Sequence, residues 1–246
     1  MFDTHCHLSE FTRQPEIIQA AFDVDISKII TVSANVSDWQ KNANIANQYP
    51  QNIIPAFGIH PLFIKDISDD VWNNLFYYVN NISGCLIGEI GLDFYNKPTN
   101  EQKQQQIATF EIQIDIAKQM NKPIIIHQRK AFNQCITLLK QQKFSNGGFA
   151  HEFSGNIEQA KQWLDLGFKL GIGTTLLKEN AKIRQVLPLL PNDAWVLESD
   201  SPFRLPENSP NILIKLVQTA AIILKKDFQE IANTTHNNAI KIIQLI

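Results

Sequence analysis

Histidine and acidic residues recur at one kind of position in this 246-residue chain, at or just after the end of a short apolar run. Five of the six histidines and two carboxylates share that position. They are His5, His7, His60, Glu89, His127, His151 and Asp200. Imidazole and carboxylate are the groups with which proteins bind zinc and other divalent first-row metals. These residue types point to metal-assisted hydrolysis, which requires that their side chains meet in space.

The elements that could bring these side chains together are short β-rich runs, each followed by a longer stretch of helical periodicity. Strands are predicted over residues 1–7, 28–34, 53–58, 85–89, 123–127, 148–151, 168–173 and 195–199. Strands that alternate with helices are typical of a parallel sheet. Eight such units in a chain of this length favour a TIM-like (β/α) barrel with outer helices, forming one domain over residues 1–246.

The helical segments carry their own signals. Apolar residues are spaced by three and four between the predicted strands, and Asn156 and Gly167 are expected to cap a helix between them. Residues 212–225 would form the eighth helix of the barrel. Residues 228–246 would add one or two helices that close it.

In a (β/α) barrel, the C-terminal ends of all strands open onto one rim, where such enzymes have their active sites. Because side chains alternate along a strand, His5 and His7 are expected to point into the barrel and Cys6 outward. The same alternation places Asp3 and Glu198 one layer deeper. There a carboxylate could accept the second N–H of a ligand histidine and fix its orientation.

Four histidines and two carboxylates exceed the three protein ligands of an ordinary catalytic zinc, so two divalent ions are expected. The predicted ligands are His5, His7 and Asp200 for one ion, His127 and His151 for the other, and Glu89 shared between them. Two ions could hold a hydroxide and stabilise an in-line phosphoryl displacement, with Asp200 as general base. Mg²⁺, Mn²⁺ and Zn²⁺ all remain possible, since affinity and availability favour different ions.

Substrate contacts are expected on the same rim. Arg129, two residues after His127, is the favoured phosphate contact, and Arg204 is a further one. His60 either contacts substrate phosphate or a metal-bound water, or caps its own loop before Pro61. Other basic residues predicted in rim loops are Lys65, Lys97, Lys130 and Lys178. Phe94, Tyr95 and Phe153 could stack on bases or pack within the rim, and residues 154–156 could bind an anion.

Composition limits the remaining possibilities. The formal net charge is -2, which argues against a protein that coats nucleic acid through overall positive charge. Cys6, Cys85 and Cys135 are scattered and are expected to be reduced and buried. No signal peptide and no run long enough to span a membrane is recognised, so a cytoplasmic protein is expected, with no membrane association and no stable protein partner.

Six strings follow one another between residues 3 and 202: DTHCHL, GIHP, GEIGLDFY, HQRKA, HEFSG and ESDSP. In this order they resemble the signatures of the TatD deoxyribonuclease family within the amidohydrolase superfamily. The resemblance implies a TIM-like barrel, divalent-metal-dependent hydrolysis and ligand roles for the six residues assigned to metal above. It departs at Ser199, where the family usually has threonine, and at residues 204–213, which lack the family's arginine-glycine and asparagine-proline pattern.

The resemblance implies a metal-dependent deoxyribonuclease of the 3′-to-5′ exonuclease type, with DNA as its partner and single-stranded ends as its expected substrate. A small amide, lactone or aminoacyl ester is the alternative, because a polarised carbonyl can meet the same hydroxide. A binding module without catalytic activity is the third reading. It conflicts with a ligand set that looks complete.

Overall fold

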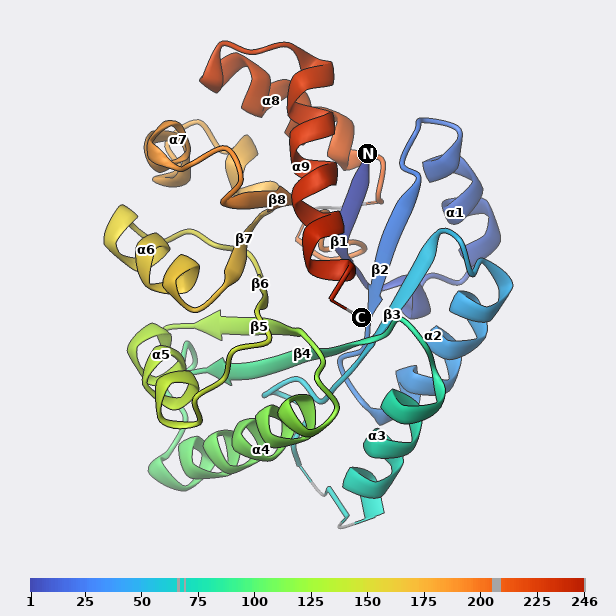
Figure 1. Cartoon of the computed structure of the whole chain (residues 1–246), viewed down its shortest axis with the longest axis vertical. Helices are drawn as coiled ribbons and strands as arrows, with labels where there is room; N and C mark the ends of the chain where they lie inside the picture. The colour runs from blue at the N-terminus through green and yellow to red at the C-terminus, as the bar shows by residue number, and fades with distance from the viewer. Residues whose placement is uncertain (66, 69, 205–208, 246) are drawn as a thin grey trace.

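The eight predicted strands form one parallel sheet whose order follows the sequence from β1 to β8 (Figure 1). The computed structural model describes residues 1–65, 67–68, 70–204 and 209–245. The strands are β1 (Phe2–Cys6), β2 (Lys28–Val32), β3 (Ile53–Phe57), β4 (Leu86–Asp93), β5 (Ile124–Arg129), β6 (Gly148–Ala150), β7 (Phe168–Ile172) and β8 (Trp195–Leu197). A parallel bridge between Cys6 and Ser201 joins the two edges of the sheet. The predicted (β/α) barrel is confirmed.

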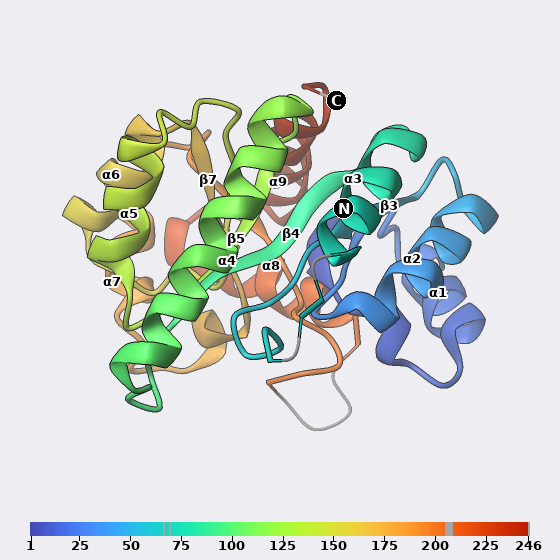
Figure 2. The same cartoon turned by 90° about the horizontal axis from the view of Figure 1, so that it is seen from below.

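Helices surround the barrel, with α1 to α3 on one side, α5 to α7 on the other and α4 between them (Figure 2). They are α1 (Gln14–Phe22), α2 (Val36–Gln48), α3 (Asp70–Asn81), α4 (Asn100–Gln119), α5 (Phe132–Gln141), α6 (Ile157–Asp165), α7 (Ile183–Val186), α8 (Ile212–Leu224) and α9 (Phe228–Ile243). Asn156 caps α6 as expected, since its side chain accepts the N–H of Gln159 at 2.9 Å. Leu166 is the C-cap, and Gly167 follows it with φ +81°.

Two apolar layers hold the strands in place. The outer layer lies between the sheet and the helices, and the inner layer lies inside the barrel. The inner layer consists of Phe2, Ile30, Val32, Ala56, Leu86, Ile125, Phe149 and Val196, together with Ala239 and Ile242 of α9. Phe2, Leu86 and Ile125 are the first or second residues of their strands, so α9 packs at the N-terminal end of the barrel (Figure 1). The opposite rim is left for polar side chains.

Two strands depart from regular pairing at a predicted metal ligand. The register of β1 against β2 shifts between Asp3 and Cys6, and that of β4 against β5 shifts between Ile87 and Ile90. Bulges of this kind re-aim side chains at barrel rims. In these two strands, His5 and Glu89 lie within the shifted stretches.

The fourth strand was predicted to end at Glu89, but it continues to Asp93. Gly91 permits this continuation. It has φ +137°, and a Cβ there would lie 2.1 Å from the backbone oxygen of His127. A residue with a side chain could not bring β4 this close to β5. Gly88 and Gly91 both belong to the interior of this strand.

Cys6, Cys85 and Cys135 are buried free thiols, as expected. Within the described residues, no helix is long and apolar enough to cross a membrane.

Candidate metal centre

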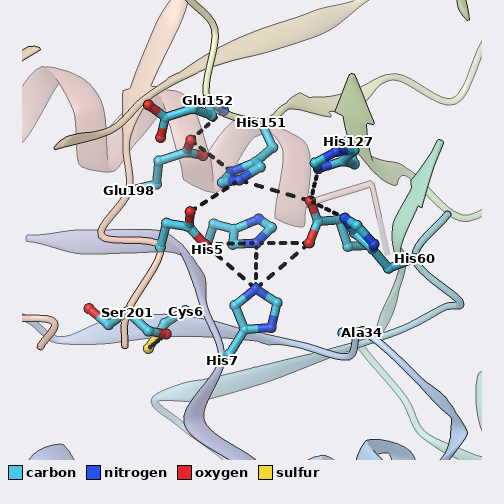
Figure 3. Close-up of polar contacts among 12 residues, drawn as sticks. His5, Cys6, His7, Ala34, His60, His127, His151, Glu152, Glu198 and Ser201 are labelled. Carbon is cyan, nitrogen blue, oxygen red and sulfur yellow. Dashed lines mark hydrogen bonds and ion pairs between the residues drawn. The ribbon is translucent and has the colours of Figure 1, made fainter. Parts of the chain in front are cut away.

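Five histidine rings converge at the C-terminal rim of the barrel. Figure 3 shows the rings of His5, His7, His60, His127 and His151 arranged around one centre. His5 lies in β1 and His127 in β5, whereas His7, His60 and His151 follow β1, β3 and β6. All of them except the partly exposed His127 are buried. Residues up to 146 positions apart thus meet at one site, His5 and His151 being the most distant pair in sequence.

Glu89 lies at the middle of this cluster and is 3% exposed. Its Oε2 is 3.4 Å from Nε2 of His5 and 3.7 Å from Nε2 of His7. Its Oε1 is 2.9 Å from Nδ1 of His127 and 3.9 Å from Nε2 of both His60 and His151. The two oxygens of one carboxylate therefore face two different sets of imidazoles. This is the arrangement that a shared ligand of two cations requires.

Asp200 approaches the same histidines from the end of β8. Its Oδ1 is 3.6 Å from Nε2 of His7 and 3.9 Å from Nε2 of His5. Its Oδ2 lies 3.7 Å from Nε2 of His151 and accepts a hydrogen bond from Nε of Arg204 at 3.1 Å. Arg204 was predicted to contact substrate, and here it contacts a candidate ligand. Residues 205–208, part of the segment that lacks the family's usual pattern, lie outside the described residues.

Asp93 is a site residue that the sequence analysis missed. Its Oδ2 lies 3.1 Å from Nε2 of His127, whose Nδ1 faces Glu89, so this imidazole is held between two carboxylates. Gln106 of α4 fixes Asp93 from behind, accepting its backbone N–H at 2.8 Å and donating to its carbonyl at 3.1 Å. Asp93 is part of the string GEIGLDFY. It could be recognised as a site residue only if β4 was expected to extend past Glu89.

Glu198 lies where the sequence analysis expected a carboxylate that orients a ligand. Its Oε1 is 2.9 Å from Nδ1 of His151 and accepts the backbone N–H of Glu152 at 2.6 Å. The carboxylate of Glu152 lies at the edge of the cluster, 3.7 Å from the guanidinium of Arg204. The His151 ring also stacks on His5, with 3.7 Å between ring centroids. His151 thus has the Glu198 carboxylate beside its Nδ1 and the His5 ring against its face.

The expected role of Asp3 as a partner of a histidine ring is wrong. Its Oδ1 accepts the backbone N–H groups of Ser199 at 2.9 Å and His5 at 3.3 Å. The register shift in β1 interrupts the alternation on which the expectation rested. Burial raises the pKa of Asp3 to about 7. Asp3 therefore ties β1 to the end of β8 through the backbone.

His60 caps its own loop, which is one of the alternatives left open for it. Its Nδ1 accepts the backbone N–H of Leu62 at 3.1 Å, which caps the loop, while its Nε2 faces Glu89. The His60 and His127 ring centroids are 4.2 Å apart. The loop hydrogen bond fixes the ring so that its second nitrogen points into the cluster.

The charges in the cluster favour cation binding. Burial lowers the pKa of His7 to about 4 and that of His60 to about 3, so both rings are neutral near pH 7 and their nitrogen lone pairs are free. Burial alone would raise the pKa of Glu89, but the adjacent His5 and His60 lower it well below its usual range. Asp200 is likewise lowered in pKa, because His151 and other imidazoles outweigh its burial. Both carboxylates are ionised.

Four groups of donors in the described residues are close enough to hold a metal ion, with their donor atoms within 4.8 Å of one another. They are His5, His7 and Asp200; His60, Glu89 and His127; His5, His151 and Glu198; and His151, Glu152 and Asp200. The first group is the set predicted for one ion. The second contains His60 where the sequence analysis had placed His151. The neutral imidazoles of His7 and His60 beside the ionised carboxylates fit divalent cations.

The predicted substrate residues lie around this centre in varied surroundings. The guanidinium of Arg129 lies 3.6 Å from the ring centroid of Tyr95, which is 50% exposed. Phe153 is buried and Phe94 is partly buried, so both pack within the rim. Lys65, Lys97, Lys130 and Lys178 are exposed. The Asn156 side chain is occupied in capping α6.

A parallel barrel with a histidine and carboxylate cluster on its C-terminal rim defines the class of metal-dependent barrel hydrolases. Residues 2–244 match the family described as TatD related DNase, and the chain belongs to that family. It is 35% identical to an uncharacterised metal-dependent hydrolase of Haemophilus influenzae, over 98% of each chain. It is 28% identical to the 3′-5′ ssDNA/RNA exonuclease TatD of Erwinia amylovora, over 97% of this chain and 98% of the other.

A solved structure supports the same grouping. The fold matches the crystal structure of YjjV, a TatD homologue from Escherichia coli K12, with a TM-score of 0.88. The match has 25% identity and covers 98% of this chain and 97% of that one. The chain is therefore a member of a metal-dependent hydrolase family.

Proposed function

We propose that this protein is a divalent-metal-dependent deoxyribonuclease of the 3′-5′ exonuclease type that acts on single-stranded DNA ends. The observation that carries the proposal is the position of Glu89, whose two oxygens face separate sets of imidazoles. The Erwinia relative carries the name of such an exonuclease. A cytoplasmic location follows from the same proposal, and the three free thiols are consistent with it.

The proposed ligands are those of the sequence analysis. His5, His7 and Asp200 hold one cation, His127 and His151 hold the other, Glu89 is shared, and Mg²⁺, Mn²⁺ or Zn²⁺ could fill both positions. When bound, such ions supply Lewis acidity that activates water and neutralises charge on a phosphoryl group. His60 lies close enough to Glu89 to join the second set or to contact the substrate.

The protein's own groups then move the proton and hold the substrate. Asp200 is ionised and its carboxylate faces His7 and His151, so it can accept the proton of the attacking water. Arg204, which donates to Asp200 and is 40% exposed in its side chain, can contact a phosphate oxygen. Arg129 supplies a second guanidinium on the same rim for the substrate backbone.

Degradation of DNA is the direct test. Metal-loaded protein is expected to shorten a single-stranded oligonucleotide labelled at its 5′ end one nucleotide at a time, and chelation followed by dialysis is expected to abolish this. Denaturing gels would show the ladder, and readdition of each ion singly would show which one restores it.

Intact DNA under all three ions would contradict the proposal. Turnover of lactones, amides or aminoacyl esters by the same preparation would then favour the alternative hydrolase, with which a net charge of -2 is compatible. Binding of DNA without any turnover would favour a binding module.

Replacing Asp93 with asparagine is expected to weaken metal binding by about 10- to 100-fold, because the carboxylate that faces His127 increases the basicity of that ring and fixes its direction. Competition for Zn²⁺ with a chromogenic chelator would measure the loss. Asp115→Asn is the matched control, since Asp115 is half exposed on α4 and pairs with Lys118. Equal affinity of Asp93→Asn and the wild type would remove Asp93 from the site.

A further inference from the structure

A cleft of about 650 Å³ opens beside the candidate metal centre. We call it the Tyr95 cleft. Its lining comes from three segments of the chain: Phe94 and Tyr95; residues 128–134; and Ser154, Gly155 and Gln159. None of the proposed metal ligands lines it. The cleft is therefore a neighbouring site and not part of the metal centre.

All three segments leave the metal centre at a residue that belongs to it. Phe94 follows Asp93, Gln128 follows His127, and Ser154 comes three residues after His151. The backbone of β4 and β5 stays paired up to this point, with Asp93 opposite Arg129. A chain bound in the metal centre and leaving past these segments would enter the Tyr95 cleft.

The cleft presents a fixed aromatic and cationic pair. The guanidinium of Arg129 lies 3.6 Å from the centroid of the Tyr95 ring, close enough for a strong cation–π contact. The backbone N–H of Tyr95 donates to Oδ1 of Asp93 at 2.9 Å, the same carboxylate that holds His127. The pair of Tyr95 and Arg129 is thus held to the metal centre through Asp93. Tyr95 is nevertheless 50% exposed.

The charge of the cleft is opposite to that of the metal centre. Arg129 and Lys130 both line it, and none of its described lining residues is aspartate or glutamate. In a chain with a net charge of -2, this is a local positive site. Cations beside an exposed ring form the combination that binds single-stranded nucleic acid, because phosphates meet the cations while bases stack on the ring.

We propose that the Tyr95 cleft is the subsite for the nucleotide next to the scissile bond, with its phosphate on Arg129 and Lys130 and its base on the Tyr95 and Arg129 pair. The inference rests on the proposed nuclease function and names the part of the substrate that this surface binds. It requires an unstacked base, so the cleft selects single strands over duplex ends. Recognition of this kind tolerates any sequence.

The catalytic test compares two substrates on metal-loaded protein. Tyr95→Ala and Arg129→Ala are each expected to lower the ratio of kcat/KM for a single-stranded oligonucleotide to that for bis(p-nitrophenyl) phosphate by about tenfold or more. The small diester has no neighbouring nucleotide, so the ratio isolates the cleft. Tyr95→Phe keeps the ring and is expected to keep the ratio. Matched controls are Tyr77→Ala and Lys140→Ala, which remove an exposed ring on α3 and an exposed cation in the last turn of α5.

A binding test separates failure of this inference from failure of the nuclease proposal. In a metal-loaded Asp200→Asn background, fluorescence anisotropy should show that a labelled ten-nucleotide single strand binds more tightly than a blunt duplex. Arg129→Ala should weaken binding and reduce the salt slope by about one. Cleft-dependent binding by this variant, together with no cleavage of the same strand by the metal-loaded wild type, would overturn only the nuclease proposal. Binding unaffected by Tyr95→Ala and Arg129→Ala, or no binding by the parent protein, would overturn the subsite.

Discussion

Replacing Asp200 with asparagine is expected to lower kcat for DNA at least about 1000-fold, which corresponds to roughly 4 kcal/mol of barrier. Asparagine preserves the shape of the side chain but carries no charge and cannot accept the proton of the attacking water. It also removes the negative partner of Arg204 and an anionic neighbour of His7 and His151. Single-turnover rates with metal in excess would measure the chemical step itself.

A structural explanation of the same loss must be excluded separately. Asp193→Asn is the matched control, because Asp193 is exposed just before the opposite end of β8. Both variants should melt within a few degrees of the wild type. If Asp200→Asn retained more than a tenth of the wild-type rate, proton transfer would have to be assigned to another group.

The barrel could be predicted because its signals are local. Each strand is a short apolar run, each helix has its own apolar spacing, and the order of the two already implies a parallel sheet. The convergence of His5, His127 and Asp200 follows from that topology alone, since every parallel strand delivers its C-terminal end to one rim. No contact between distant residues had to be known in advance.

What could not be predicted depends on departures from regular geometry. Alternation placed Asp3 under His5, but a shift in the pairing of β1 turns Asp3 toward the backbone of Ser199. The fourth strand was expected to end at Glu89, whereas Gly91 lets it pass close to His127 and carry Asp93 into the site. Each irregularity depends on how the strand pairs with its neighbour. The sequence of one segment does not give that pairing.

The aromatic residues of the rim were likewise predicted only in part. Three were considered as base platforms because they follow candidate ligands in the sequence. Only Tyr95 is substantially exposed, whereas Phe153 is buried and Phe94 is partly buried against the core. Proximity in sequence placed all three rings near the site, but the exposure of each ring depends on its packing in the folded chain, which the sequence alone does not give.

Glu89→Gln is expected to have the largest effect of any single change, because it alters both halves of the site together. Glu89 faces five imidazoles through two oxygens, and its neutral amide can neither bridge two cations nor balance the charge around it. We expect the bound metal, measured by inductively coupled plasma mass spectrometry after gel filtration, to fall from two ions per chain to one or none. DNA turnover should fall at least about 1000-fold with it.

The metal count distinguishes this prediction from a general loss of structure. Glu230→Gln is the control, since Glu230 is half exposed on α9 at the closed end of the barrel and pairs only with Lys226 among the described ion pairs. That variant should keep both ions and full turnover. Two tightly bound ions in a folded Glu89→Gln protein would show that the carboxylate is not shared. The donors would then have to be reassigned, with His60 and His127 holding the second ion without Glu89.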